Sequence, residues 1–440
     1  MVVDAPPSSG SVKPSFAFDS ITERWPRILT RIVDQMHQKH NESVKKFGES
    51  GDADVKHIIH NLSRLRYMIV TDKPLELLQT ELTDGEVWNA EIKRYREKVG
   101  EKEATWYKLP WLFTECYEYR LIYQFFQDTK NFKDYDPFRI EKEKSYYDST
   151  AHLLALATEL LKSIKAEGEL QGERLKTEIS RLLQVSLWGN KADLSLSGGD
   201  PHFMSETLFK ELHDLRANIL VDDIDAACER LMNLGEKKQV DVILDNSGLE
   251  LFTDLCLGEL LVATGLATKV VFHGKAHPWY VSDVTKEDFE WVIETTAADN
   301  DPFLRELAGR WKTNVQKCLF EYKTHPFYTF GFAYSEMPER SPDLYAELQQ
   351  SSFLIFKGDL NGRKLIGDRD WPPTTAFLEV LKGFQLTDFI SLRTLKAETV
   401  AGLPEAAHKR MLEKFGPKDR SWQVSSDYAV AQAFFKDPSV

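Results

Sequence analysis

The sequence predicts an α/β protein in which a helical N-terminal domain is joined to an α/β/α sandwich with a mostly parallel, Rossmann-like sheet. Apolar residues recur at helical spacing from residue 16 to 185, and almost no stretch there is typical of a strand. From about residue 205, short apolar runs alternate with helical segments, which is the pattern of a parallel sheet covered by helices. We therefore expect a flexible lead at 1–15, a helical domain at 16–197 and an α/β/α domain at 205–435.

The N-terminal half begins with a Pro- and Ser-rich lead and continues as a series of helices. In the first helix Trp25, Ile28, Leu29, Ile32 and Met36 share one face. Similar spacing predicts further helices at 55–70, 82–99, 118–128 and 147–185.

Residues 106–120 are unusually rich in aromatic side chains. One interpretation is that they pack at a domain seam, where Glu115 and Arg120 form an ion pair. The other is that the stretch closes over a catalytic cleft, with Arg120 presenting its planar guanidinium to a phosphate or to Glu115. The next polar segment holds Asn190 and Asp193, which either form a plain capped turn or reach a metal site from the domain junction.

One strand-to-helix turn organises the second half. Val240 to Leu244 form an almost continuous apolar run typical of a strand buried on both faces, and this run stops at Asp245 and Asn246. Gly248 then opens a segment with helical spacing. In an open α/β sheet such a turn lies at the carboxyl edge, where ligands bind.

Other apolar runs also end at polar groups. Strands are predicted at 268–274, 352–357 and 388–392, and the run 279–284 leads up to Asp283 and a helix start at 285–288. Because the carboxyl ends of parallel strands meet at one edge, we expect their polar ends to converge. The polar side chains that follow the last two strands are Asp359, Asn361, Arg363, Arg393 and Lys396.

This convergence predicts a metal site and a phosphate site side by side. Asp245, Asn246 and Asp283 offer only oxygen ligands, which suit a hard or borderline divalent ion. The cations Arg363, Arg393 and Lys396 would neutralise phosphoryl oxygens, while Asp359 and Asn361 would hold hydroxyl groups. Such a site predicts phosphate-ester hydrolysis, with either a metal-activated water or Asp245 itself as the in-line nucleophile.

Less specific interpretations compete with this site. An Asp-Asn pair before a helix is often only an N-cap, and a Lys or Arg after a strand is usually solvated. Other catalytic schemes find no support, because the sequence has no GxxxxGK[ST] loop, no GxSxG elbow and no cysteine-phosphatase spacing. His273 and His277 are interpreted as loop or seam histidines.

Composition narrows the classes of partner. The chain of 440 residues carries 56 basic and 69 acidic residues, a net charge of −13, which makes nucleic acid an unfavourable partner. Four cysteines lie far apart, and no apolar run is long enough for a membrane span. We expect a cytoplasmic or nuclear protein with a small phosphorylated substrate, no membrane partner and no nucleotide cofactor. The oligomeric state is left open, and a monomer is compatible with the sequence.

Several motifs together resemble the damage-control phosphatase family, formerly the domain-of-unknown-function-89 group. They are Leu-Asp-Asn-Ser-Gly-Leu-Glu at 244–250, Val-Ser-Asp-Val-Thr at 281–285, Gly-Asp-Leu-Asn at 358–361 and Arg-Thr-Leu-Lys at 393–396. The last is similar to the Arg-Thr-x-Lys signature of the eukaryotic sugar-phosphate phosphatase branch. Segments 111–120 and 188–194 also match, so the resemblance covers nearly the whole chain.

The resemblance implies a divalent ion on Asp245, Asn246 and Asp283, with Mn²⁺, Co²⁺, Ni²⁺ or Mg²⁺ as the ion. It also implies hydrolysis of fructose 1-phosphate, fructose 6-phosphate and related esters. The implied substrate contacts are Asp359, Leu360, Asn361, Gly362, Arg363 and Lys396.

Two other functions are weighed against hydrolysis. Methylation of protein carboxylates with S-adenosylmethionine has also been attached to this branch, but that cofactor needs a glycine-rich turn after the first strand, and 245–249 contains one glycine. A non-catalytic binding module is the third possibility. It predicts that Asp245→Ala or Asp283→Ala leaves the activity intact.

Overall fold

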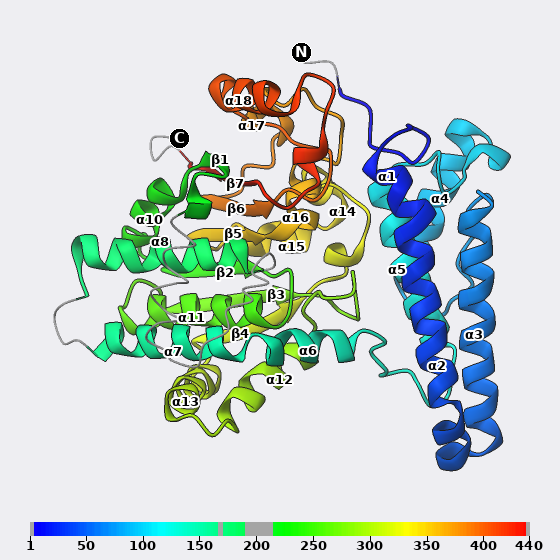
Figure 1. The fold of residues 1–440 in the computed structure, drawn as a ribbon, viewed down its shortest axis with the longest axis horizontal. Helices are drawn as coiled ribbons and strands as arrows, with labels where there is room; N and C mark the ends of the chain where they lie inside the picture. The colour runs from blue at the N-terminus through cyan, green and yellow to red at the C-terminus, as the bar shows by residue number, and fades with distance from the viewer. Residues whose placement is uncertain (1–3, 166–169, 190–213, 437–440) are drawn as a thin grey trace.

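The computed structural model describes residues 4–165, 170–189 and 214–436, and it shows an α/β sandwich with a long helical pair beside it (Figure 1). A single seven-stranded sheet forms the centre. Its strands are β1 (Ile219–Asp222), β2 (Gln239–Ile243), β3 (Lys269–Gly274), β4 (Phe320–Thr324), β5 (Phe353–Lys357), β6 (Phe389–Thr394) and β7 (Ala429–Phe434).

The sheet order is β1-β7-β6-β5-β2-β3-β4. Strands β2 to β6 are mutually parallel, whereas β7 runs antiparallel to β6 and carries β1 alongside it in parallel. The predicted mostly parallel α/β sheet is therefore confirmed. Because the chain leaves β2 towards β3 and β4 and later returns to place β5 on the other side of β2, the switch point of the topology lies between β2 and β5. Ligands bind at the carboxyl ends of strands at such a point.

Three strands were not predicted from the pattern. Strand β4 is an edge strand with a mixed polar sequence, and β1 is the other edge. Strand β7 is rich in alanine, which has low strand propensity. The run 279–284 is a loop, because Tyr280 and Val281 have φ values of 45° and 71°, far from extended backbone.

The N-terminal helices form the separate layer in Figure 1, and α5 lies between the long helical pair and the sheet. The described residues before β1 contain only isolated β-bridges and no strand, as the helical pattern predicts. These helices are α1 (Phe16–Asp19), the π-helical turn η1 (Ser20–Arg24), α2 (Trp25–Phe47), α3 (Glu49–Val70), α4 (Gly85–Val99) and α5 (Trp111–Gln127).

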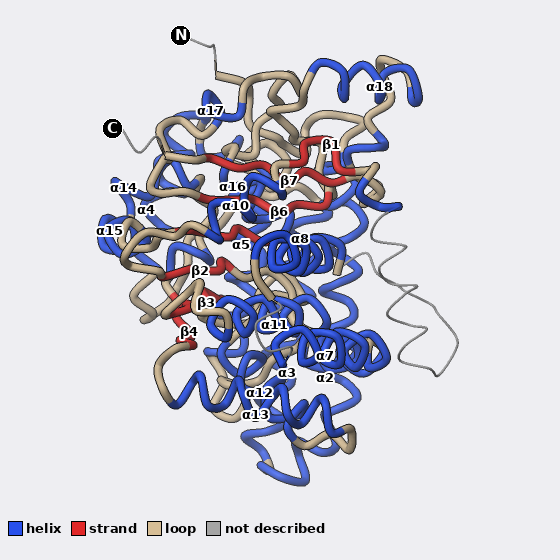
Figure 2. The backbone as a smooth tube through the Cα atoms, turned by 90° about the vertical axis from the view of Figure 1, so that its left-hand side faces the viewer, coloured by secondary structure: helices blue, strands red, loops and turns tan. Residues whose placement is uncertain are grey.

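Helices cover both faces of the sheet (Figure 2). On one face α7 and α8 share an apolar core with α11 and with β2, β3 and β5. On the other face α14 and α15 contribute to the core that also contains α2, α3 and α5. The remaining helices are α6 (Arg139–Asp148), α7 (Thr150–Lys165), α8 (Gly172–Trp188), α10 (Ile224–Met232), α11 (Leu249–Ala263), α12 (Lys286–Ala297), α13 (Pro302–Gln316), α14 (Met337–Arg340), α15 (Pro342–Leu348), α16 (Gly358–Leu365), α17 (Phe377–Val380) and α18 (Glu405–Phe415).

The aromatic stretch of α5 is buried where the N-terminal helices meet the sheet domain. Trp111 to Arg120 are all buried, and the ring of Tyr119 stacks on that of Tyr280 with centroids 4.6 Å apart. This arrangement agrees with the interpretation of residues 106–120 as a packed seam. Among the described helices, none combines the length and the apolar character required to cross a bilayer.

Candidate active site

A cavity of about 700 Å³ lies between the N-terminal helices and the carboxyl ends of β2 and β5. Its walls come from α1, η1, α2 and α5 on one side and from the sheet edge and α16 on the other. Of the residues predicted for the site, the cavity is lined by Asp245, Asn246, Asp283, Asp359, Leu360, Arg363 and Lys396.

The turn after β2 approaches the turn after β5 very closely. Gly358 has a φ of +81°, and a Cβ atom there would lie 1.9 Å from Asp245 Oδ2. Only glycine combines this backbone conformation with the absence of a side chain. Position 358 therefore determines how near Asp245 sits to α16.

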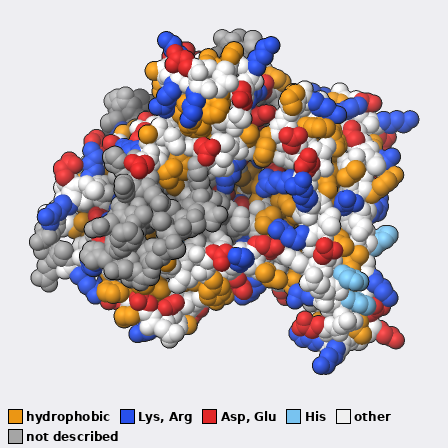
Figure 3. All heavy atoms as spheres, viewed as in Figure 1, with side chains coloured by type: hydrophobic (Ala, Val, Ile, Leu, Met, Phe, Trp, Pro, Cys, Tyr) orange, Lys and Arg blue, Asp and Glu red, His pale blue; other side chains and the backbone are white. Residues whose placement is uncertain are grey.

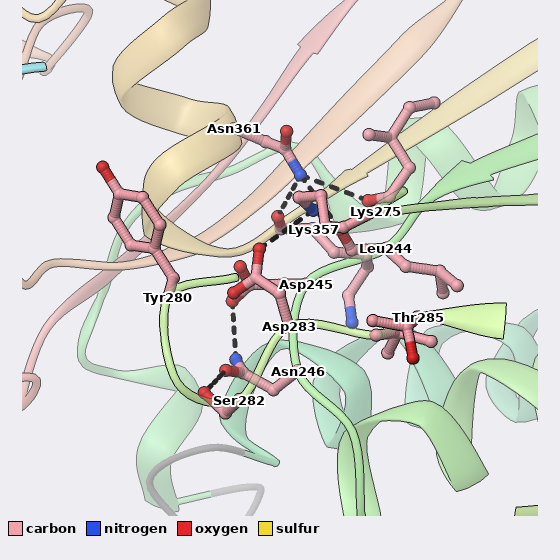
Figure 4. A network of polar contacts seen from close by, with 12 residues as sticks. Leu244, Asp245, Asn246, Lys275, Tyr280, Ser282, Asp283, Thr285, Lys357 and Asn361 are labelled. Atoms are coloured by element: carbon pink, nitrogen blue, oxygen red, sulfur yellow. Dashed lines mark hydrogen bonds and ion pairs between the residues drawn. The ribbon is translucent and has the colours of Figure 1, made fainter. Parts of the chain in front are cut away.

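The loop that carries Asp283 is tied to the turn after β2 by backbone pairing. Asn246 and Asp283 form an isolated antiparallel bridge, in which Ser247 N donates to Ser282 O at 2.8 Å and Val284 N donates to Asp245 O at 2.9 Å. Figure 4 shows the side chains of Asp245, Asn246 and Asp283 drawn together by this pairing. Asp245 and Asn246 therefore share one corner of the cavity with Asp283, which follows Asp245 by 38 positions in the sequence.

Asn246 is oriented by a network of polar contacts. Its Nδ2 group donates to Asp245 Oδ2 at 2.6 Å and to Glu250 Oε2 at 2.8 Å, and its Oδ1 atom accepts from the hydroxyl of Ser282. Figure 4 shows the bonds to Asp245 and Ser282. The amide is thus held in one orientation beside two carboxylates.

The acids of this corner are crowded and buried. Burial raises the pKa of Asp245 well above its ordinary value, and the charges of Asp283 and Glu250 raise it further, against Lys396 and Lys275. Burial also raises the pKa of Asp283, although Lys275 Nζ lies 3.0 Å from its Oδ2 atom. Burying these carboxylates in their ionised form costs free energy unless a positive charge lies close to them.

A divalent ion fits this donor set. The side-chain oxygens of Asp245, Asn246 and Asp283 are the hard ligands that Mg²⁺ and Mn²⁺ prefer. Asp283 Oδ2 is buried, and the described residues give it an ion pair with Lys275 Nζ at 3.0 Å but no hydrogen bond of favourable geometry. No cluster of three or more His, Cys, Asp or Glu side chains arranged as metal ligands occurs among residues 4–165, 170–189 and 214–436, so any ion here must also use the Asn246 amide or water.

Lys396 differs from the arginines of the cavity lining, each of which lies beside an acidic partner. Its side chain lines the cavity and makes no hydrogen bond or ion pair with the part of the chain that the structure describes. Its backbone N lies 3.3 Å from Asp359 Oδ1, which also accepts from Arg393 Nε at 2.9 Å. Arg393 thereby lowers the pKa of Asp359, even though burial opposes this shift.

The other predicted contacts are engaged elsewhere. Arg363 lines the cavity, but its guanidinium bonds Glu115 at 2.7 Å and Asp368 at 2.9 Å. Neither Arg393 nor Gly362 lines the cavity, and they lie so close that a Cβ atom at 362 would be 2.3 Å from Arg393 Cδ.

Asn361 also lies outside the cavity lining. It accepts from the hydroxyl of Tyr334 at 2.8 Å and donates to Lys357 O at 2.8 Å. Its side chain therefore braces the turn after β5.

Arg120 does not occupy either position considered from the sequence. Its Nη2 and Nε groups bond Asp84, at 2.9 and 2.5 Å, and its Nη1 group bonds Gln124 at 2.9 Å. Glu115 instead accepts from Tyr280 and Arg363. The predicted ion pair between Arg120 and Glu115 is not formed, because residues five positions apart point to different sides of a helix and each side chain has other partners. Arg120 is buried and does not line the cavity. Asn190 and Asp193 lie outside the described residues.

Several residues near the site were not foreseen. Lys357 is fully buried and bonds Glu250 at 2.8 Å and Asp254 at 3.0 Å, which supports the carboxylates behind Asn246. The one available signal was that Glu250 follows Asn246 by four residues, one helical turn. The N-terminal wall gave no signal, because its amphipathic spacing is that of any packed helix. The unforeseen lining residues on that wall include Asp19, Glu23, Arg24, Arg27 and Arg31.

Comparisons with known proteins agree on one family. A model of the damage-control phosphatase ARMT1-like domain matches residues 20–412. The chain is 39% identical over 437 residues to damage-control phosphatase ARMT1 of Danio rerio, covering 97% of both chains. It is 38% identical to the Mus musculus protein of that name, covering 95% of this chain and 96% of the relative, and 37% identical to the Homo sapiens protein, covering 96% and 97%. The resemblance seen in the sequence motifs is thus confirmed, and the chain belongs to the damage-control phosphatase ARMT1-like family, a family of phosphoric monoester hydrolases by its name.

Proposed function

We propose that this protein is a divalent-metal-dependent phosphatase of small phosphorylated metabolites, with sugar phosphates such as fructose 1-phosphate and fructose 6-phosphate as substrates. One observation carries the proposal. Asp245, Asn246, Asp283 and Lys396 come from three separate segments, and all line one cavity at the switch point of the sheet. Oxygen ligands beside an uncommitted cation are what binding of a phosphate ester with a divalent ion requires.

Asp245, Asn246 and Asp283 are the residues that would hold the ion. Mn²⁺, Co²⁺, Ni²⁺ or Mg²⁺ bound there supplies positive charge for phosphoryl oxygens and lowers the pKa of bound water. Lys396 would bind the phosphoryl group on the side that faces away from the ion. Asp359 Oδ1 accepts from the backbone N of Lys396 and from Arg393 Nε. Asp359 and Arg393 would therefore contribute by positioning Lys396.

Two nucleophiles are compatible with this arrangement. In one route a carboxylate oxygen of Asp245 attacks phosphorus, the P–O bond to the alcohol breaks, and water then hydrolyses the aspartyl phosphate. In the other route water attacks phosphorus directly, the same P–O bond breaks, and the alcohol leaves with the proton that the water loses, while Asp245 would only hold the ion. Acid quenching during turnover and peptide mapping would distinguish them, since only the first route leaves phosphate on Asp245.

The function is tested by measuring phosphate release from a panel of sugar phosphates with Co²⁺, Ni²⁺, Mn²⁺ and Mg²⁺, and with a chelator. We expect release that depends on the ion and is lost with the chelator. No release from any ester with any of these ions would overturn the proposal. Tight binding of S-adenosylmethionine to the metal-free protein, measured by calorimetry, would favour the methyltransferase alternative.

A further inference from the structure

The cavity is larger than hydrolysis of one hexose monophosphate requires. It measures about 700 Å³, whereas such a molecule fills about 200–250 Å³ at the packing density of organic solids. The lining includes Lys396 and Asp245 at the sheet edge and, on the opposite wall, Arg27 and Arg31 of α2. Room therefore remains for a substrate that extends away from the reacting phosphate.

The wall opposite the sheet edge holds three arginines. Arg24, Arg27 and Arg31 are spaced by three and four residues, which places them on one side of the helix, and all three line the cavity. Figure 3 shows Lys and Arg side chains gathered along the edge of the helical pair that faces the sheet. Two acids, Asp19 and Glu23, share this wall, so positive charge is in excess there although the whole chain carries −13.

Two of these arginines are free to exchange partners. Arg27 pairs with Glu23 at 2.8 Å, but their side chains are 78% and 62% exposed, and such ion pairs contribute little. Arg31 lies 3.2 Å from Glu141 through Nε, and its guanidinium makes no hydrogen bond to a described residue. Arg24 differs, because it lies 3.8 Å from Glu115 and is surrounded by buried acids and tyrosines.

We propose that Arg27 and Arg31 bind a second anionic group at the far end of the substrate, so that the preferred substrates are small metabolites with a phosphate at each end. The inference rests on the proposed function, because it assumes that the reacting phosphate sits between Lys396 and the Asp245 corner. Guanidinium groups bind phosphate oxygens through two parallel hydrogen bonds, which suits a terminal phosphate better than a neutral hydroxyl. Asp19 and Glu23 on the same wall would repel negative charge spread over the cavity. The arginines therefore favour a single anionic group held at one position.

The test compares fructose 1,6-bisphosphate with fructose 1-phosphate, using the full chain and the best ion from the panel. The measured quantity is the ratio of kcat/KM for the bisphosphate to kcat/KM for the monophosphate, in wild type and in the double variant Arg27→Gln/Arg31→Gln. The control is Arg66→Gln, the same substitution at an exposed arginine on α3 outside the cavity lining.

We expect a wild-type ratio above about tenfold, a roughly tenfold fall in the double variant, mainly through KM for the bisphosphate, and no change with Arg66→Gln. We also expect the wild-type ratio to fall as salt is raised. A wild-type ratio near one, an unchanged ratio in the double variant, or an equal fall with Arg66→Gln would each overturn the inference while leaving the proposed function standing. Hydrolysis of neither ester would overturn both.

Discussion

Gly358 lies so close to Asp245 that a single methyl group cannot be placed between them: its Cβ position is 1.9 Å from Asp245 Oδ2. These residues follow β2 and β5, the two strands that flank the switch point of the sheet. The close approach gives the site a strict geometric requirement that can be tested.

Gly358→Ala should reduce phosphatase activity by at least about 100-fold. The new methyl group displaces Asp245, and a displacement of about 1 Å is enough to cost that much. The matched control is Gly383→Ala, because Gly383 has a similar φ of +86° but nothing within 4 Å of its Cβ position. We expect the control to lose about 1 kcal/mol of stability from its backbone conformation and to keep its activity. Equal activity in the two variants would show that the approach of Gly358 to Asp245 has no role in catalysis.

Asp283→Asn should lower kcat/KM by a factor of about 100 or more and weaken binding of the divalent ion, because one of two proposed carboxylate ligands is lost. It should also lower the stability of the ion-free protein, since Lys275 loses the carboxylate that lies 3.0 Å from its Nζ atom. Activity assays, calorimetric titration with Mn²⁺ and thermal denaturation measure these effects. Asp148→Asn, at an exposed acid of α6, is the control for loss of charge alone. If the ion binds Asp283→Asn as tightly as wild type, Asp283 is not a ligand.

Lys396→Gln should raise KM and lower kcat, by a factor of about 100 together in kcat/KM, because its charge is proposed to act on the phosphoryl group in both the ground and transition states. Stability should change little, since the side chain has no partner among the described residues. Lys409→Gln on α18, exposed and far along the chain, serves as the control. A variant with wild-type kinetics would move the phosphate away from this side of the cavity.

Lys364 should make stability rise with pH above neutrality. Burial lowers the pKa of this lysine to about 7, while its unfolded value is about 10.4. Between these values the unfolded chain binds more protons, so the free energy of unfolding should increase by on the order of 1 kcal/mol per pH unit. Below pH 7 both states bind the proton and this contribution no longer changes.

Urea denaturation at pH 7 to 9.5 measures this slope in wild type and in Lys364→Met. The variant should be less stable overall, because Phe327 O and Phe330 O lose their donor, but its pH slope should be smaller. Equal slopes would mean that Lys364 stays protonated in the folded protein.

The spacing of apolar residues along the chain was sufficient to predict the fold class, and the polar residues at the strand ends included most of those that line the cavity at the sheet edge. The apolar run before Asp245 indicated a buried strand, and its sudden end indicated the carboxyl edge, because parallel strands must end on the same side. The same reasoning applied to 352–357 and 388–392, and the structure brings Asp359 and Lys396 to the same cavity as Asp245. Edge strand β4 and the alanine-rich β7 escaped prediction, because half-exposed or small side chains leave little periodic signal.

What the sequence determined by itself was therefore the order of helices and strands, the polar residues at the strand ends and the family to which their motifs belong. Only the tertiary structure decided the partners: Arg120 bonds Asp84, Glu115 bonds Arg363 across 248 positions, and the arginines of α2 face the site. The physical reason is that periodicity is a property of neighbouring residues and reports which face of an element is buried. The partner across that face is chosen by how distant elements pack, and many arrangements satisfy the same pattern.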